Sequence, residues 1–169
     1  MADGTPLRIL TVIDAFTREG LALDVALTTS ADRVIDVLTA LLAQHGTPMH
    51  LRSDNGAEFV ATTVQAWLAQ RDVQPLYIEP GKPWQNGKDE RFNGTVRDAC
   101  LNLHGFTTLV EACVRIGTFR QHYNHERPHS QLGYLTPLAF KAAWLEAQAK
   151  QQDSYHCHLT RSWALAQVA

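Results

Sequence analysis

The stretch Met49-His-Leu-Arg-Ser-Asp-Asn-Gly56 joins a short apolar segment to a strong turn signal. Residues 49–52 predict a brief buried strand, and the Ser-Asp-Asn-Gly sequence that follows is typical of a tight turn. Asp54 therefore stands at the end of a strand, where its carboxylate can project from the edge of a sheet into a cleft. The rest of the chain can be assigned outward from this strand and its turn.

Two short apolar runs upstream, at 7–13 and 21–27, are rich in residues that favour β-structure. The segment between them contains turn formers, so the pair predicts a β-hairpin. A helix that runs to about residue 44 is expected next. Ser30 or Asp32 can cap the N-terminus of this helix, and Gly46 and Pro48 end it.

Helices dominate the pattern downstream. They are expected at about 61–71, from Asn86 to about 104, from Thr107 or Thr108 to about 124, and from Pro137 to about 151. A short strand at 75–79 and a Pro- and Gly-rich loop at 80–87 separate the first two of these helices. Strands first, and then helices alternating with short strands, indicate an α/β domain with a mixed sheet flanked by helices. No regular period follows the last helix.

The composition is that of a folded globular domain. The chain has 169 residues, of which 45% are hydrophobic and 19% charged, and this fits one domain. No apolar run approaches the roughly 20 residues of a membrane helix, and no signal-peptide pattern opens the sequence. Three cysteines without a Cys-x-x-Cys pair indicate neither a disulfide framework nor a four-cysteine zinc site. A reducing cytoplasm is therefore the expected compartment.

The formal net charge of −2 hides an uneven distribution. Residues 1–79 carry five basic and ten acidic side chains, and residues 80–130 carry seven basic and five acidic ones. Residues 131–169 are near neutral. A polyanion such as DNA would therefore meet the middle third of the chain, although a solvated helix face gives the same count.

Asp54 and Glu90 are the two carboxylates whose placement suggests chemistry. Glu90 falls in the first turn of the helix after the 80–87 loop, on a different face from that helix's apolar stripe. Mg²⁺ binds oxygen ligands, and two such ions about 4 Å apart can clamp the attacking and leaving oxygens of a phosphodiester. The alternative is structural, with Asp54 in an Asx turn and Glu90 as a partner of the helix dipole. The apolar stripe comprises Phe92, Val96, Ala99 and Leu103.

Several segments resemble one family, in family order. Leu51–Phe59 and Pro80–Gly94 look like the second and third acidic motifs of the DDE transposases and retroviral integrases. The similarity is greatest to bacterial insertion-sequence transposases whose second reading frame encodes an integrase-like core. The resemblance covers roughly residues 2–140 and continues through Val12–Arg18, Arg97–Asn102 and Tyr123–Pro137.

This resemblance implies a ribonuclease-H-like fold and DNA strand cleavage and joining, performed by multimers on transposon ends and target DNA. It also implies two divalent metal ions, Mg²⁺ or Mn²⁺, held by two Asp and one Glu. Asp54 matches the second catalytic Asp of the family, and Glu90 matches the catalytic Glu. The positions implied in DNA contact are Lys82, Gln85, Asn86, Arg97 and Arg127.

The first catalytic Asp of the family lies in the middle of its first strand, in a pattern like Trp-x-x-Asp, and the second and fourth strands flank that strand. Asp14 instead matches the end of the second strand, and too few residues separate it from Asp54. The first strand and its Asp are therefore expected to fall before Met1. Residues 1–140 would form an integrase-like core without its first strand, and residues 141–169 a C-terminal helix and an unassigned tail. Such a chain would hold metal weakly and be inactive or impaired.

Three alternatives stay open. The chain could be a non-catalytic DNA-binding or regulatory fragment of a transposase, which would have the same fold. It could be a simple ribonuclease-H-type nuclease, although such an enzyme would lack the Arg-Pro-His-Ser region at 127–130. It could bind zinc, although its Cys and His residues fit no known spacing: Cys113, His122, His125, His129 and the His-Cys-His sequence at 156–158. Trp67 and Trp84 could stack on bases, but Trp67 lies on a core-facing stripe, which is typical of packing.

Overall fold

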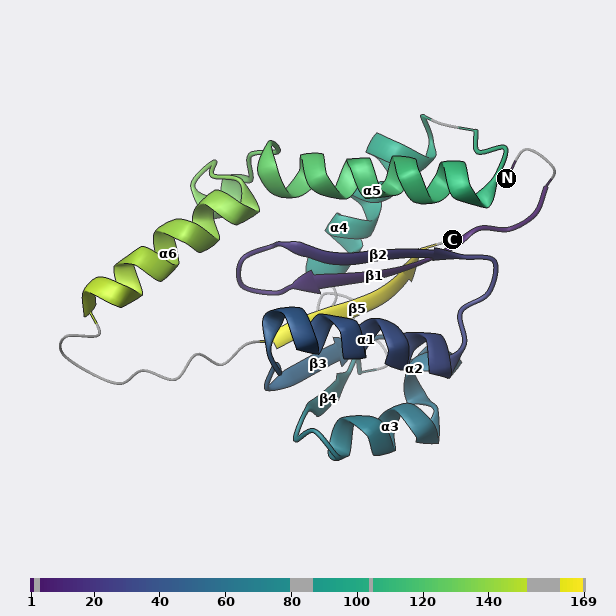
Figure 1. Cartoon of the computed structure of the whole chain (residues 1–169), viewed down its shortest axis with the longest axis horizontal. Helices are drawn as coiled ribbons and strands as arrows, with labels where there is room; N and C mark the ends of the chain where they lie inside the picture. The colour runs from purple at the N-terminus through teal and green to yellow at the C-terminus, as the bar shows by residue number, and fades with distance from the viewer. Residues whose placement is uncertain (2–3, 80–86, 104, 152–161, 169) are drawn as a thin grey trace.

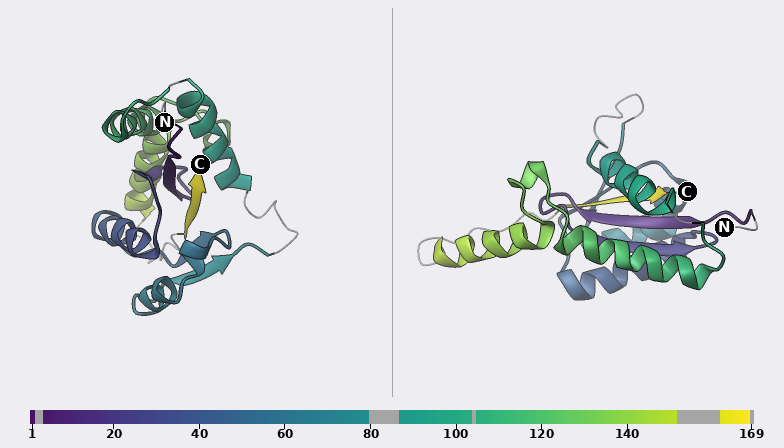
Figure 2. Two further views of the ribbon diagram at one scale, coloured as in Figure 1. Left: turned by 90° about the vertical axis from the view of Figure 1, so that its right-hand side faces the viewer. Right: turned by 90° about the horizontal axis from the view of Figure 1, so that it is seen from above.

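The chain folds into a five-stranded mixed sheet with helices on both faces (Figures 1 and 2). The computed structural model describes residues 1, 4–79, 87–103, 105–151 and 162–168. The strands are β1 (Arg8–Asp14), β2 (Gly20–Ala26), β3 (His50–Ser53), β4 (Gln74–Tyr77) and β5 (Ser162–Val168). The helices are α1 (Ala31–His45), α2 (Ala57–Val60), α3 (Thr62–Ala69), α4 (Gly87–Val96), α5 (Leu109–His125) and α6 (Pro137–Gln151), with a π-helical turn η2 (Arg97–Leu101) and a 3₁₀ turn η3 (Ser130–Leu132).

The strand order in the sheet is β2-β1-β5-β3-β4. β1 and β2 form an antiparallel hairpin, as predicted, and β3 and β4 are a parallel pair. β5 joins these two halves, because it runs antiparallel to β1 and parallel to β3. Figure 1 shows β5, in yellow, between β1 and β3, although it comes from the C-terminal part of the chain. The predicted mixed sheet flanked by helices is confirmed.

β5 holds the position that the sequence analysis expected to be empty. In the resembled family the first strand is flanked by the second and fourth strands, which correspond here to β1 and β3. No regular structure is predicted for the segment that forms β5, yet its residues 163–168 pair with β1 and its residues 162–165 pair with β3. The central strand of the sheet therefore comes from the 141–169 part of the chain.

Two apolar cores lie on opposite faces of the sheet, and β5 contributes to both. Trp163 and Leu165 are each 1% exposed and belong to the core that α1 and α3 cover. Ala164 belongs to the other core, together with Phe92 and Val96 of α4. Because side chains of a strand alternate between the two faces, the large residues of β5 fill one core and its small residues let α4 approach the other face.

The N-termini of α1 and α5 are capped by the residues that the sequence indicates. Ser30 accepts a hydrogen bond from the first turn of α1 at 3.3 Å, and Thr108 accepts one from the Glu111 N–H at 3.1 Å. The Glu111 carboxylate accepts bonds in return from the N–H (3.0 Å) and hydroxyl (2.7 Å) of Thr107. These bonds, together with one from Arg115, lower the pKa of Glu111 to about 2. The cap therefore carries a negative charge at the positive end of the α5 dipole.

The helix that begins at residue 87 departs from its expected form at its C-terminal end. The sequence predicts one α-helix to about residue 104, whereas α4 is followed by the π-helical η2, closed by a hydrogen bond from the Asn102 N–H to the Arg97 carbonyl O at 2.8 Å. A π-helical turn contains more residues than an α-helical turn, so the inward-facing position shifts. Cys100 is buried, and Leu103 is 68% exposed. The predicted apolar stripe is right for its first two residues and wrong for Leu103.

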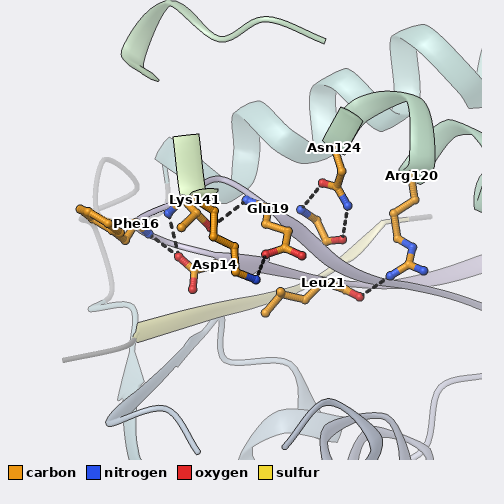
Figure 3. A network of polar contacts seen from close by, with 9 residues as sticks. Asp14, Phe16, Glu19, Leu21, Arg120, Asn124 and Lys141 are labelled. Atoms are coloured by element: carbon orange, nitrogen blue, oxygen red, sulfur yellow. Dashed lines mark hydrogen bonds and ion pairs between the residues drawn. The ribbon is translucent and has the colours of Figure 1, made fainter. Parts of the chain in front are cut away.

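Asn124, which is 6% exposed, ties α5 to β2. Its Oδ1 accepts a hydrogen bond from the Gly20 N–H at 2.8 Å, and its Nδ2 donates to the Gly20 carbonyl O at 3.0 Å. A Cβ on Gly20 would lie 3.1 Å from the Phe92 ring, so glycine at this position of β2 makes room for the Phe92 side chain of α4. Figure 3 shows Asn124 beside Arg120, which donates from Nη1 to the Leu21 carbonyl O at 2.6 Å.

α6 begins at Pro137, as predicted, and reaches back to the β1–β2 turn. Lys141 donates from Nζ to Glu19 Oε2 at 2.7 Å, and the Phe16 ring contacts the rings of Phe140 and Trp144. Neither α6 nor any other helix in the described parts of the chain is long and apolar enough to cross a membrane.

Replacing Trp163 with alanine is expected to lower the free energy of unfolding by about 3–5 kcal/mol, because the change leaves a cavity beneath the central strand. Urea denaturation followed by circular dichroism measures this loss. The matched control is Leu103→Ala, which removes an exposed side chain and should change the free energy of unfolding by less than about 0.5 kcal/mol. Equal stability of the Trp163→Ala variant and the parent would show that β5 does not pair in the sheet in solution.

Candidate functional site

Asp54 directly follows β3 and stands, as predicted, in a turn at the carboxyl end of that strand. Its Oδ1 accepts a hydrogen bond from the Gly56 N–H at 2.9 Å, which is an Asx-turn contact. The neighbouring Asn55 donates from Nδ2 to the Ile78 carbonyl O at 3.0 Å, so the turn is fixed to the chain after β4. The Asp54 side chain is partly exposed, so it combines this structural contact with access to solvent.

Glu90 lies in the first turn of α4 and is exposed. α4 packs on β5 and β1, and Asn93 reaches the sheet one turn after Glu90. The Thr11 hydroxyl of β1 lies 2.9 Å from Asn93 Oδ1 and 2.9 Å from the Ala166 carbonyl O. Asp54 and Glu90 thus belong to two elements, the end of β3 and α4, that contact the same central strand.

Asp14 lies at the opposite end of the sheet from Asp54. β5 is antiparallel to β1 and parallel to β3, so the carboxyl ends of β1 and β3 point in opposite directions. Asp14 pairs with Trp163 of β5, and Trp163 pairs with Leu51 of β3. Leu51 is three residues before Asp54, so the levels of Asp14 and Asp54 differ by about 10 Å along the strand direction. The Asp14 carboxylate instead holds the β1–β2 turn, because its Oδ1 accepts 2.8 Å hydrogen bonds from the backbone N–H groups of Phe16 and Thr17 (Figure 3).

The described residues do not supply a complete set of metal ligands. Within the parts of the chain that the structure describes, no three His, Cys, Asp or Glu side chains lie close enough together to hold one ion. A two-ion centre for phosphodiester chemistry needs carboxylates to hold and bridge both ions. Asp54 and Glu90 are two such groups, so the residues present fit this kind of centre only in part.

A cleft of 490 Å³ opens beside the N-terminal half of α4. Three arginines line it from different elements: Arg18 from the β1–β2 turn, Arg91 from α4 and Arg127 from the segment after α5. Arg18 also donates from Nη2 to Gln131 Oε1 at 3.1 Å, which joins the turn to the 128–131 loop. The described residues of the lining carry three guanidinium charges and no carboxylate, so the lining itself is positively charged.

His129 lies in the lining of this arginine cleft. Its ring packs edge-on against Tyr123, with 4.8 Å between ring centroids. Its Nε2 is buried and has no hydrogen-bond partner among the described residues. Burial lowers the pKa of His129 below its usual value of 6.5, and the charges of Arg127 and Arg18 lower it further. The imidazole is therefore mostly neutral at pH 7.

The residues implied in DNA contact do not all meet in one place. Arg127 lines the arginine cleft. Arg97 is exposed at the start of η2, two turns after Glu90, and lines a second cleft of 480 Å³ with the N-terminal segment. The three implied residues of the loop before α4 lie outside the described residues: Lys82, Gln85 and Asn86.

Arg18 and Arg91 are cleft residues that the sequence analysis missed. Arg91 directly follows Glu90, so its proximity to the carboxylate could have drawn attention to it. Arg18 gives no such signal: it has a positive φ of 62° in the β1–β2 turn, and only the fold brings this turn against residues 127–131.

The structural alternatives for other residues are also resolved in part. Trp67 is 9% exposed in the core that α1 and α3 cover, with the Arg71 guanidinium 4.1 Å from its ring centroid, so the packing prediction is confirmed. His122 contacts Glu126 Oε2 at 3.1 Å. Of the other residues named as alternatives, Cys113 is exposed on α5 and His125 ends that helix. Trp84 and residues 156–158 lie outside the described parts of the chain.

The fold resembles solved integrase cores. It matches the HTLV-2 integrase catalytic core domain in complex with magnesium (trimeric form) with a TM-score of 0.59 and 18% sequence identity, over 78% of this chain and 82% of that one. Together with the strand order, this match defines the class of fold: a ribonuclease-H-like domain of the kind found in integrases.

Sequence comparison narrows this class to one family. Two family models, both described as an integrase core domain, match residues 1–83 and 71–137. The insertion element IS476 39.2 kDa protein of Xanthomonas euvesicatoria is 40% identical over 149 residues, which are 88% of this chain and 43% of that protein. The transposase for insertion sequence element IS904 of Lactococcus lactis is 29% identical over 106 residues, 62% of this chain and 42% of that protein. The chain thus belongs to the integrase core domain family, as the core of an insertion-sequence DDE transposase, and spans less than half the length of these two relatives.

Replacing Arg127 with glutamine is expected to raise the pKa of His129, because the substitution removes one of the two positive charges that disfavour the imidazolium. The pKa should stay below 6.5, since burial is the largest cause of the shift and does not change. An NMR titration of the histidine ring signals measures it. Arg115→Gln, outside the cleft lining, is the matched control and should leave the value unchanged. An unchanged pKa in Arg127→Gln would place Arg127 away from the cleft.

Proposed function

We propose that this chain is the core with which an insertion-sequence transposase binds DNA ends, and that Asp54 and Glu90 are its metal-binding carboxylates. One observation carries the proposal: both carboxylates lie on elements that contact the central strand β5, and the arginine cleft opens beside the same helix, α4. Because the chain spans less than half of its relatives, the proposal concerns the core alone.

Divalent ions in such a centre supply charge neutralisation and an activated nucleophile at the scissile phosphodiester. Two carboxylates leave most coordination positions of Mg²⁺ or Mn²⁺ to water, so Asp54 and Glu90 alone would bind these ions weakly. We therefore infer that this chain is inactive or strongly impaired in strand cleavage and strand transfer.

The arginine cleft is proposed to hold the phosphate backbone. Guanidinium groups bind phosphate oxygens through paired, charge-assisted hydrogen bonds, and three of them converge here around a mostly neutral imidazole. Such contacts position DNA without reading its sequence, so the cleft would set the register of a DNA end relative to Glu90. The other contacts proposed for DNA, by their match to the family, are Lys82, Gln85, Asn86 and Arg97.

A second candidate function follows from the incomplete set of metal ligands among the described residues. A non-catalytic DNA-binding or regulatory core would use the same arginines and would occupy transposon ends without cutting them. It would act in the bacterial cytoplasm and associate with other copies of the core. The two candidates share DNA binding and differ in cleavage, so separate measurements distinguish them.

Replacing Arg127 with glutamine should weaken binding of a 30-base-pair duplex by about threefold to tenfold at physiological salt, because one phosphate contact is lost. The slope of log K against log salt concentration should fall by about 1. Fluorescence anisotropy without divalent metal measures both quantities. Arg115→Gln is again the matched control, because Arg115 pairs with Glu111 on α5. If Arg127→Gln and Arg91→Gln both bind like the parent, DNA does not use this cleft.

In a strand-transfer assay with Mg²⁺ or Mn²⁺, the purified parent chain should give no more product than its Asp54→Asn variant, because the metal centre is incomplete in both. The assay uses a labelled duplex and a supercoiled target plasmid. Robust metal-dependent cleavage that Asp14→Asn abolishes would overturn the expectation and make Asp14 a metal ligand.

A further inference from the structure

We propose that Ala166 occupies the position from which a third carboxylate would complete a metal centre with Asp54 and Glu90, so that β5 replaces a ligand-bearing strand in structure but not in chemistry. The inference rests on the proposed metal-binding role of Asp54 and Glu90. It explains why the described residues fit a two-ion centre only in part.

The strand register places Ala166 beside Asp54. β3 and β5 run parallel, and their paired residues end at Ser53 and Leu165. The next residue along each strand is Asp54 on one side and Ala166 on the other. Neighbouring strands lie about 4.8 Å apart, so a side chain at residue 166 would start within reach of an ion bound by Asp54.

The side chain of Ala166 faces α4. Ala166 pairs directly with Thr11 of β1, and paired residues point to the same face of a sheet. The Thr11 hydroxyl lies 2.9 Å from Asn93 of α4, so this face is the one that α4 covers. Ala164, two residues before Ala166, packs in the same α4 core.

Glu90 lies on the same face of α4 as Asn93, one turn closer to the helix N-terminus. Residues three apart on a helix are neighbours, separated by about 4.5 Å along the axis. The methyl group of Ala166 therefore points to the region between the Asp54 turn and the Glu90 face of α4.

The sequence of β5 supports the same assignment. Trp163-Ala-Leu-Ala166 has the spacing of the family's Trp-x-x-Asp pattern, with alanine where the pattern has aspartate. Trp163 and Leu165 keep the apolar contacts that hold the strand, at 1% exposure each. Ala166 is 3% exposed and offers no oxygen to a metal ion. β5 therefore retains the packing function of the position without the ligand.

Ala166→Asp tests the proposal by restoring the carboxylate. The variant should bind Mn²⁺ at least about tenfold more tightly than the parent in a calorimetric titration, because a third anionic oxygen ligand joins the site. It should melt at a lower temperature than the parent without metal, because three carboxylates repel one another, and should regain thermal stability when Mn²⁺ is added. Ala166→Asn, of equal size and without charge, should show neither change with Mn²⁺. Ala166→Asp/Asp54→Asn should lose the gain.

Three outcomes would overturn the proposal. One is a folded Ala166→Asp variant that binds Mn²⁺ no better than the parent, and another is an equal gain in Ala166→Asn. The third is an Ala166→Asp variant that stays unfolded in Mn²⁺ while Ala166→Asn folds. A thiolate at the same position provides a test that does not depend on Ala166→Asp. The Ala166→Cys variant should bind Cd²⁺ more tightly than the parent, and adding Asp54→Asn should reverse this gain.

The same preparations separate this inference from the proposed function. DNA binding through the arginine cleft is measured without metal and does not involve Ala166. Normal DNA binding without a Mn²⁺ gain in Ala166→Asp would overturn only the inference. A Mn²⁺ gain without DNA binding by the parent would overturn only the proposed DNA-binding role.

Discussion

The pairing of β5 with both β1 and β3 is the interaction on which the rest of the structure depends. Without it the β1–β2 hairpin and the β3–β4 pair would each expose a row of unpaired backbone groups within the sheet, and buried backbone groups without partners are costly. β5 satisfies both rows at once and places Trp163 and Leu165 in the core beneath α1 and α3. The two halves of the domain are thus one sheet only because a distant segment lies between them.

The candidate site takes its geometry from that pairing. Asp54 has a defined position relative to α4 because β3 and α4 both contact β5, and among the described strands only β5 lies between β3 and β1. The arginine cleft depends on the other half of the domain, where Asn124 fixes α5 to β2 and the β1–β2 turn meets the 127–131 loop. Asp54 therefore approaches α4 from one end of the sheet, and Arg18 approaches it from the other.

Local sequence signals account for much of this fold. The hairpin, the caps at Ser30 and Thr108, the start of α6 at Pro137 and the placement of Asp54 and Glu90 all follow from short patterns. β5 could not be found in this way, because a short, mostly apolar run is equally compatible with a buried strand or a buried helix. Its partners also lie far away in the sequence, more than 100 residues off in β3 and about 150 in β1. The π-helical shift that exposes Leu103 and the turn that carries Arg18 are likewise set by packing between elements. The sequence signal for β5 is the Trp-x-x-Ala spacing of residues 163–166. It can be recognised only when alanine is accepted in place of the aspartate in the family's Trp-x-x-Asp pattern.

The arrangement also separates two requirements that a central strand usually meets together. Holding the sheet requires backbone pairing and large apolar side chains on the α1 face, and β5 supplies both. Holding a metal ion requires an oxygen ligand on the α4 face, and Ala166 supplies none. Because side chains alternate between the faces, either requirement can change without the other. Backbone pairing and the apolar face of β5 hold the sheet together, so the proposed metal-binding and DNA-binding roles can be gained or lost separately.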